Sequence, residues 1–232
     1  MSLKIELCDL NISANAEKCL SIASSAIQNS EWTLAGGMGS DYFWDIDYLI
    51  HDKNKSKEIL NLFVDSIKKL EKENIIDFNT LGFIDKGNDG PLGMVSFFIA
   101  IQSKIAKKFI IIRPKKLLLK SAIKGSILNV SDKVLILSDV ATTGRGIFKA
   151  SQKVKDYGAK VSGALVLFDR TQGANENLQR KGINLFSIFS AEKIYSSKFV
   201  RDTLKERHKK RIIKDFNPRL IDLGGNIEVA VR

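Results

Sequence analysis

An acidic residue, a turn rich in Thr and Gly, and a helix-forming segment follow one another directly in the middle of this sequence. Residues 133–148 read Lys-Val-Leu-Ile-Leu-Ser-Asp-Val-Ala-Thr-Thr-Gly-Arg-Gly-Ile-Phe. The backbone N–H groups of such a turn and of the helix start converge on an anion. Thr142 and Thr143 add hydroxyl donors, and Gly144 and Gly146 permit close approach to a phosphate and, where needed, a positive φ. Asp139 is placed to accept hydrogen bonds from sugar hydroxyls, so the run predicts a sugar-phosphate site.

Two alternatives to this interpretation stay open. The whole run is also compatible with an ordinary strand, turn and helix that binds nothing. Arg145, the cation inside the turn, either strengthens phosphate binding or blocks the site through an ion pair with Asp139.

Cations also occur where two other predicted strands run into loops. Arg113, Lys115 and Lys116 follow one strand and can neutralise a leaving pyrophosphate, whose charge builds as its bond breaks. Lys86, followed by Gly87, comes after another strand. For the group at 113–116 the alternative is a solvated basic loop.

Two residues have side chains suited to a planar ligand. Arg170, next to Asp169 at a strand end, can present a planar fork to a carboxylate or to the edge of a pyrimidine. The alternative is a surface ion pair. Phe43, beside Trp44, either stacks on a base or packs within its own segment.

The hydrophobic pattern predicts the elements that must position these side chains. Near-continuous apolar strands alternate with helices, which is typical of an α/β fold with a parallel sheet covered on both faces. In such a sheet, ligands bind at the carboxyl ends of the strands. The predicted strands are 80–85, 109–113, 133–139, 161–168 and 183–189, and the predicted helices are 14–29, 56–72, 91–107 and 147–157.

Local features refine three of these elements. The helix at 56–72 is expected to bury an apolar face, namely Leu60, Phe63, Val64, Ile67 and Leu70. The helix at 147–157 is expected to end at Gly158. Residues 31–47 mix aromatic residues with Gly and Asp, which predicts a hairpin or a loop between strands.

Composition limits the class of protein. The chain has 232 residues, of which 44% are hydrophobic and 27% charged, and its net charge of +11 favours anionic partners. No apolar run reaches the ~18 residues that span a membrane, and residues 1–6 lack the apolar core of a signal peptide. Cys8 and Cys19 are too few for a disulfide framework, and His51 and His208 lack metal-ligand spacing. We therefore expect a soluble cytoplasmic protein.

Residues 133–148 resemble the phosphoribosyl pyrophosphate (PRPP) motif of type I phosphoribosyltransferases, and the chain looks closest to the orotate phosphoribosyltransferases. The segment 33–43 is similar to the family's N-terminal hood. Phe109–Arg113 is similar to the strand that begins the family's mobile catalytic loop, and 158–170 is similar to the strand ending in its orotate-contacting Arg. The resemblance covers roughly residues 20–200.

The resemblance implies a Rossmann-like α/β fold and a pyrimidine-biosynthesis transferase, a glycosyltransferase that moves a 5-phosphoribosyl group from PRPP to orotate. It implies Mg²⁺ as cofactor and a homodimer in which one subunit's loop serves the other's site. It also implies PRPP binding by Lys86, Arg113, Asp139 and residues 142–146, catalysis by Lys115, Lys116 and Asp139, and base binding by Phe43 and Arg170. We expect an N-terminal helix and hood at 1–50, a phosphoribosyltransferase core at 51–190, and a basic helix and tail at 191–232.

Three departures from the family pattern leave an alternative function open. Ser138 stands where the family has the first of two adjacent acids, and Ala35 and Gly39 stand where it has Lys. The loop 113–125 lacks the family's acids and His and contains Leu117-Leu118-Leu119. The alternative is a catalytically impaired sensor or regulator that binds PRPP or, through the basic stretch 191–216, nucleic acid.

Overall fold

The computed structural model describes residues 5–6, 27–33, 39–44, 52–85, 106, 108–113 and 122–192, with backbone alone described before residue 52. Within this part of the chain, the main sheet has seven strands in the order β1-β9-β8-β7-β4-β5-β6, and β2 and β3 form a second sheet. The strands are β1 (Ile5–Glu6), β2 (Ile27–Thr33), β3 (Gly39–Trp44), β4 (Thr80–Ile84), β5 (Lys108–Ile112), β6 (Ile123–Gly125), β7 (Lys133–Ala141), β8 (Lys160–Asp169) and β9 (Leu185–Ser190). The helices are α3 (Lys53–Lys72), α5 (Arg145–Asp156) and α6 (Ala174–Gln179).

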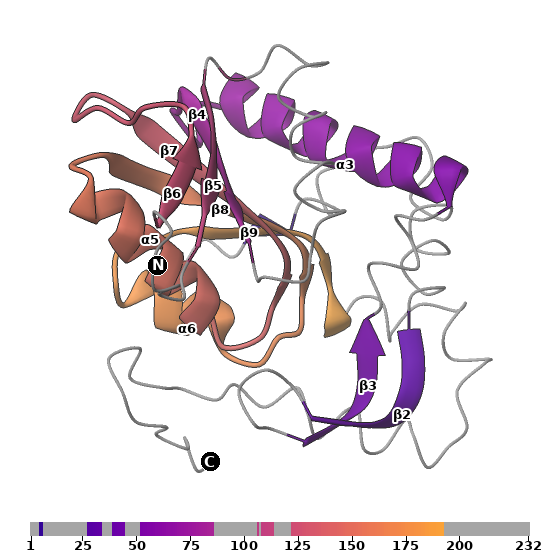
Figure 1. Ribbon diagram of the computed structural model, residues 1–232. Coiled ribbons are helices and arrows are strands. Elements are labelled where there is room, and N and C mark those ends of the chain that lie inside the picture. The colour runs from indigo at the N-terminus through magenta and orange to yellow at the C-terminus, as the bar shows by residue number, and fades with distance from the viewer. Residues whose placement is uncertain are drawn as a thin grey trace.

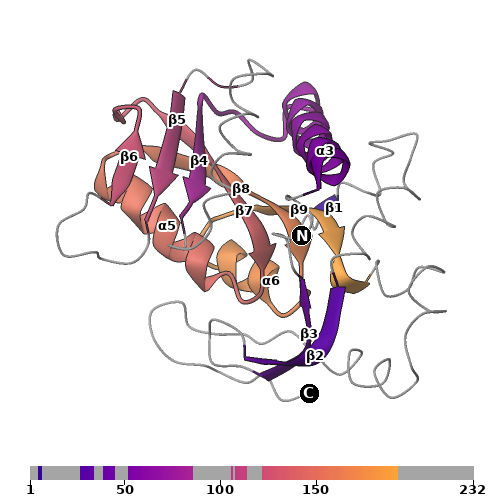
Figure 2. The same cartoon turned by 45° about the vertical axis from the view of Figure 1, so that its right-hand side comes forward.

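The α/β architecture predicted from the sequence is confirmed. Every neighbouring pair from β1 to β5 in the main sheet is parallel, and only the edge strand β6 runs antiparallel to β5. Helix α3 lies on one face of this sheet, and α5 and α6 lie on the other (Figures 1 and 2). The sheet is therefore mixed at one edge and covered on both faces.

The centre of the sheet is apolar because both of its faces are covered. In β7, residues 134–137 are at most 1% exposed, and residues 164–168 of β8 are equally buried. Gly82 in β4 permits close packing, since a Cβ there would lie 2.8 Å from Val134 Cγ1 and 2.9 Å from Ile112 Cδ1. These strands are rigid supports for the residues that follow their carboxyl ends.

Helix α3 begins earlier than predicted and presents a slightly different face to the sheet. The Asp52 carboxylate caps it by accepting hydrogen bonds from the backbone N–H groups of Asn54 (2.9 Å) and Lys55 (3.0 Å). Of the apolar face predicted for this helix, Phe63, Ile67 and Leu70 are buried, and Leu60 and Val64 are half-buried. The residues it buries are Ile59, Leu62, Phe63, Ser66, Ile67 and Leu70.

Helix α5 also begins earlier than predicted, at Arg145 rather than Ile147. Its predicted stop is confirmed, because Gly158 has φ +82° and donates its N–H to the Lys155 carbonyl at 2.8 Å. The earlier start brings Arg145 and Gly146 into the first turn of the helix.

The N-terminal prediction is partly wrong. Residues 27–29, expected to end a helix, belong to β2, because β2 pairs with β3 in the register Ile27↔Trp44 and Gln28↔Phe43. The predicted hairpin is confirmed by the same pairing, and both views place it beyond the carboxyl end of β9 (Figures 1 and 2). The predicted helices 91–107 and 191–216 lie outside the described residues, apart from Ala106, which is not helical, and residues 191–192.

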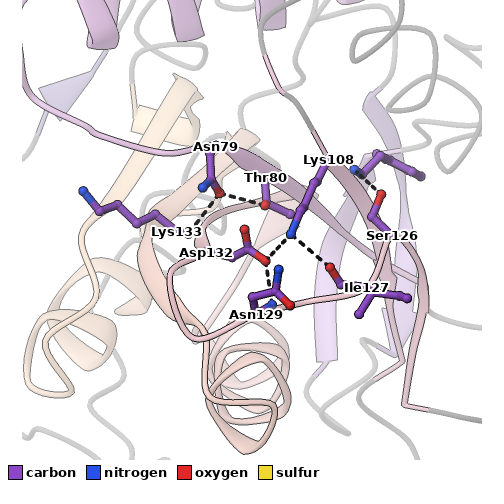
Figure 3. A network of polar contacts seen from close by, with 9 residues as sticks. Asn79, Thr80, Lys108, Ser126, Ile127, Asn129, Asp132 and Lys133 are labelled. Carbon is purple, nitrogen blue, oxygen red and sulfur yellow. Dashed lines mark hydrogen bonds and ion pairs between the residues drawn. The ribbon is translucent and has the colours of Figure 1, made fainter.

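A polar network ties the amino ends of the strands together (Figure 3). The Lys108 Nζ donates to Asp132 Oδ2 at 2.7 Å and to the Ile127 carbonyl at 3.1 Å. The Asn129 N–H donates to the same Asp132 oxygen at 2.6 Å. Asn79 Oδ1 accepts from the Lys133 N–H and from Thr80 Oγ1. The network joins β4, β5 and β7 at the edge opposite to the one where they end.

Candidate active site

The predicted phosphate turn lies between the end of β7 and the start of α5. Gly144 precedes the helix with φ +80°, and no side chain caps the helix start. A Cβ at Gly144 would lie 2.8 Å from Leu178 Cγ, so both backbone conformation and packing require glycine there. The N–H groups of a first helical turn have no acceptor within the helix. An uncapped turn at a strand's carboxyl end is therefore suited to an anion.

Gly146 has no such structural requirement. Its φ is not positive, it is exposed, and a Cβ added there would meet nothing within 4 Å. Glycine inside a helix costs up to about 1 kcal/mol relative to alanine. Neither backbone conformation nor packing therefore requires glycine at position 146.

Asp139 lies near the carboxyl end of β7 and is half-buried. Its Oδ1 accepts the Val140 N–H at 2.6 Å and the Ser138 hydroxyl at 3.1 Å. Ser138 itself is 3% exposed. The Ser138 hydroxyl therefore helps to orient the Asp139 carboxylate.

The hydroxyl-bearing residues and the cation of the turn lie next to this carboxylate along the chain. Thr142 and Thr143 are half-buried, and within the described residues neither hydroxyl has a hydrogen-bond partner. Arg145, also half-buried, is the first residue of α5. The structure thus brings Asp139 and residues 142–146 together at one strand end, as predicted.

Arg170 follows β8, the strand beside β7. It is 2% exposed, and its Nε donates to Gln172 Oε1 at 3.2 Å. Its backbone N–H donates to the Ala141 carbonyl at 2.9 Å, which ties it to the residue just before the phosphate turn. Arg170 is therefore buried and does not lie at the surface, where one interpretation of the sequence placed it.

The residue after Arg170 is strained. Thr171 has φ +54°, a region that β-branched residues avoid, and its Oγ1 is buried without a partner. Its N–H donates to Asp169 Oδ1 at 2.9 Å. Strain of this kind persists where surrounding structure enforces it, and it is concentrated at functional sites.

Arg113 lies at the end of β5, on the same edge of the sheet. Its Nε donates to Asp85 Oδ2 at 2.8 Å, and its Nη1 is buried without a hydrogen-bond partner. The Arg113 N–H donates to the Ala122 carbonyl at 2.8 Å and so closes the base of the connection from β5 to β6. With 16% side-chain exposure, Arg113 does not belong to a solvated basic loop.

Not every predicted site residue can be placed. The backbone of Phe43 lies in β3 opposite Gln28. Lys86, Lys115 and Lys116 lie outside the described residues.

In the described part of the chain, no group of three or more His, Cys, Asp or Glu side chains could hold a metal ion. None of the described helices is long and apolar enough to cross a bilayer.

Two residues of this region escaped the sequence reasoning. Asn177 in α6 is 1% exposed, and its Nδ2 donates to the Thr143 carbonyl at 3.0 Å. Asp85 is the partner of Arg113. For Asn177 the only available signal was an Asn-Leu pair in an otherwise polar stretch, and that signal does not identify a contact 34 residues away.

No family model matches this chain. It is 31% identical over 180 residues to the orotate phosphoribosyltransferase of Pyrococcus abyssi, covering 77% of this chain and 93% of the relative. The crystal structure of orotate phosphoribosyltransferase from Aeropyrum pernix matches with a TM-score of 0.59 and 23% identity, over 76% of this chain and 96% of that one.

A further solved structure is the Mycobacterium tuberculosis H37Rv orotate phosphoribosyltransferase in complex with 5-phospho-alpha-D-ribosyl 1-diphosphate, that is, PRPP. It matches with a TM-score of 0.55 and 22% identity, over 76% of this chain and 96% of that chain. At this identity the two solved structures establish the likeness of fold alone.

Proposed function

Because this chain belongs to the orotate phosphoribosyltransferase family, we propose that it transfers the 5-phosphoribosyl group of PRPP to a ring nitrogen of orotate and releases pyrophosphate. It is a transferase of pyrimidine nucleotide biosynthesis with the type I phosphoribosyltransferase fold. The observation that supports the donor best is the uncapped turn at 142–146, with Asp139 beside it. A cytoplasmic setting is part of the proposal.

The proposed roles follow from positions along the carboxyl edge. Residues 142–146 hold the 5-phosphate through N–H and hydroxyl donors, and Asp139 accepts hydrogen bonds from the ribose hydroxyls. As the bond from ribose C1 to the pyrophosphate oxygen breaks, positive charge develops on the sugar and negative charge on pyrophosphate. The carboxylate of Asp139 stabilises an oxocarbenium-like sugar in that step.

The leaving group requires cations. The Arg113 guanidinium, whose Nε is held by Asp85 at the carboxyl end of β5, is proposed to donate hydrogen bonds to pyrophosphate. Lys86, Lys115 and Lys116 are proposed to add charge there. Arg170 and Phe43 are proposed to orient the base, with Arg170 as the fork that recognises its carboxylate.

The residues that the structure describes could hold Mg²⁺ together with the bound donor. With no cluster of three ligands among them, Mg²⁺ would be held by oxygens of the bound donor and by the single carboxylate of Asp139. This ion commonly binds through one or two carboxylates together with phosphates and water. When bound, it would neutralise charge on the pyrophosphate.

An active enzyme is favoured over the sensor or nucleic-acid alternative. The relative from Pyrococcus abyssi carries an enzyme's name and aligns over nearly its whole length. Ser138, which stands where the family has an acid, donates a hydrogen bond to Asp139, so the carboxylate is still oriented. A homodimer, in which the loop after Arg113 completes the partner's site, is proposed for the assembly.

The proposal is tested by a panel of acceptor bases. Wild-type protein, PRPP and Mg²⁺ are incubated separately with orotate, uracil, adenine and hypoxanthine, and nucleotide products are separated by chromatography. We expect the monophosphate of orotate and little product from the other bases. Preference for another base would leave the family in place and refute orotate as the acceptor.

A further inference from the structure

We propose that Asn177 is a positioning residue for the phosphate turn, and that it sets the direction of one N–H group toward the donor's 5-phosphate. The inference rests on the proposed function, because it needs the phosphate to bind at residues 142–146. Asn177 touches the backbone of the turn rather than the substrate. Its predicted effect is therefore on the shape of the site.

The first observation is a buried hydrogen bond between α6 and the turn. Asn177 is 1% exposed, and its Nδ2 donates to the Thr143 carbonyl at 3.0 Å. The partners are 34 residues apart in sequence. A buried amide that gives its N–H to a backbone carbonyl satisfies both groups, and removing it leaves the carbonyl without that donor.

The second observation is the packing of α6 against the next residue of the turn. The space around Gly144 is closed by Leu178 Cγ, 2.8 Å from an added Cβ, and by the Ala174 carbonyl at 3.2 Å. The hydrogen bond and this contact come from consecutive residues of one helix. Together they hold the Thr143–Gly144 peptide against α6.

The geometry of the peptide bond fixes the direction of the Gly144 N–H. No cis peptide bond occurs in the described residues, so the Thr143–Gly144 peptide is planar and trans. In a trans peptide the C=O and the N–H point in opposite directions. Because the Thr143 C=O points at α6, the Gly144 N–H points away from α6. We place the anion on that side of the peptide, at the start of α5.

The same short segment also carries the proposed base contact. Arg170 is seven residues before Asn177, and its backbone N–H donates to the Ala141 carbonyl at 2.9 Å. Two tethers from the 170–178 segment, at Ala141 and at Thr143, therefore enclose the first residues of the turn.

The Thr143–Gly144 peptide group can be observed by itself in an NMR spectrum. The dipeptide Thr-Gly occurs once in the sequence, at Thr143-Gly144. Protein labelled with ¹³C-carbonyl threonine and ¹⁵N-glycine therefore gives one carbonyl-to-amide correlation in an HNCO spectrum. Its ¹³C shift reports the hydrogen bond from Asn177, and its ¹H shift reports the bond from Gly144 to phosphate.

The ligand added in this test is ribose 5-phosphate, which carries the 5-phosphate of PRPP and lacks its pyrophosphate. In wild-type protein we expect its addition to move the ¹H shift downfield. Asn177→Ala should move the ¹³C shift upfield in the free protein, reduce the ¹H response, and raise the Kd for ribose 5-phosphate about tenfold. Binding of pyrophosphate alone should change less than twofold, because it uses other residues.

Two further variants keep the test decisive. Asn177→Asp fits the same space, removes the donor and adds negative charge, so it should bind ribose 5-phosphate more weakly than Asn177→Ala. Gln179→Ala, an exposed position on the same helix, should leave both ligands unaffected. An unchanged Kd and ¹H response in Asn177→Ala, or equal loss of both ligands, would overturn the positioning role. Wild-type binding of ribose 5-phosphate with no ¹H response at Gly144 would instead refute the turn as the phosphate site.

Discussion

At the residue scale, the two glycines of the phosphate turn differ in whether the fold requires glycine at that position. Gly144 is required by its φ of +80° and by contact with Leu178, whereas Gly146 is required by neither conformation nor packing. Sequence reasoning treated the two alike, because a pattern of residue types does not reveal which glycine adopts a positive φ. The structure separates a glycine that the fold requires from one that neither conformation nor packing requires.

This difference predicts opposite effects on stability. Gly144→Ala should lower the free energy of unfolding by about 2 kcal/mol, because it forces a side chain into a left-handed conformation and against Leu178. Gly146→Ala should raise it by up to about 1 kcal/mol and yet weaken PRPP binding at least tenfold. Urea unfolding and calorimetry measure the two quantities. Normal PRPP affinity in Gly146→Ala would show that its open space is not used.

A second residue prediction concerns Arg170. Arg170→Lys keeps a positive charge but loses the planar fork, so we expect KM for orotate to rise about tenfold or more while KM for PRPP stays within twofold. Steady-state kinetics with each substrate varied in turn measures both. Equal damage to both substrates would make the buried Arg170 a structural residue. The thermal midpoint of the variant serves as the folding control.

Local residue patterns predicted the turn but not its supports. Asp139 and residues 142–146 are consecutive or nearly so, and their order along the chain already implies a strand end and a helix start. The hydrogen bond from Asn177 to Thr143 and the ion pair of Asp85 with Arg113 join distant segments. Such partners follow from which strands and helices become neighbours, and that information is absent from a single local run.

At the element scale, the two edges of the sheet are built differently. The carboxyl edge has uncapped and unpartnered polar groups, such as the start of α5 and Arg113 Nη1. The amino edge has the network around Asp132, a residue that is 2% exposed. Burial alone would raise the pKa of Asp132, but hydrogen bonds with Lys108 and the Asn129 N–H outweigh it, and the pKa lies below its ordinary value of 3.8.

The network predicts an acid-dependent loss of stability. A carboxyl group whose pKa is lower in the folded state contributes stability above its unfolded pKa, and that contribution is lost as pH falls through the folded pKa. The Asp132 contribution should therefore be intact at pH 7 and decline below about pH 4. Asp132→Asn should lower the free energy of unfolding at pH 7 by about 3 kcal/mol.

Urea unfolding at a series of pH values tests this prediction. The difference in the free energy of unfolding between wild type and Asp132→Asn should become smaller below about pH 4, because the wild type loses its charged hydrogen bonds there. PRPP affinity at pH 7 should be unchanged in the folded variant, since the network lies at the other edge of the sheet. A gap that is the same at every pH would mean that the Asp132 charge does not stabilise the fold.

The long, strongly apolar elements were predictable and the short ones were not. Buried strands such as β7 and β8 have continuous hydrophobic runs, and Gly158 marks the end of α5. The three-residue β6 and the six-residue α6 have too few residues to show a period. The helix predicted at 14–29 failed at its end because pairing with β3 extends residues 27–29.

At the scale of the whole molecule, the described strands β4, β5, β7 and β8 end side by side. Asp85, Arg113, Asp139 and Arg170 lie at these ends, on one edge of one sheet. The proposed reaction needs a phosphate site, a ribose site, a leaving-group site and a base site in a row. A parallel sheet provides that row because its strands all finish at the same edge.

The proposed homodimer predicts complementation between two damaged subunits. A double variant, Lys115→Ala with Lys116→Ala, and Asp139→Asn should each be nearly inactive. If the loop of one subunit serves the partner's site, mixing and exchanging the two should restore about a quarter of wild-type activity, because half of the dimers gain one intact site. Each variant mixed with itself is the control. No recovery after demonstrated subunit exchange would contradict a shared site.

The most direct test of the central claim is orotate-dependent release of pyrophosphate from PRPP by the wild-type protein with Mg²⁺. Orotate consumed and pyrophosphate formed are measured in the same reaction, with Asp139→Asn as the matched control. We predict a one-to-one ratio for wild type and a loss of at least a hundredfold in rate for the variant. PRPP binding by calorimetry without any orotate consumption would contradict the assignment as an active orotate phosphoribosyltransferase.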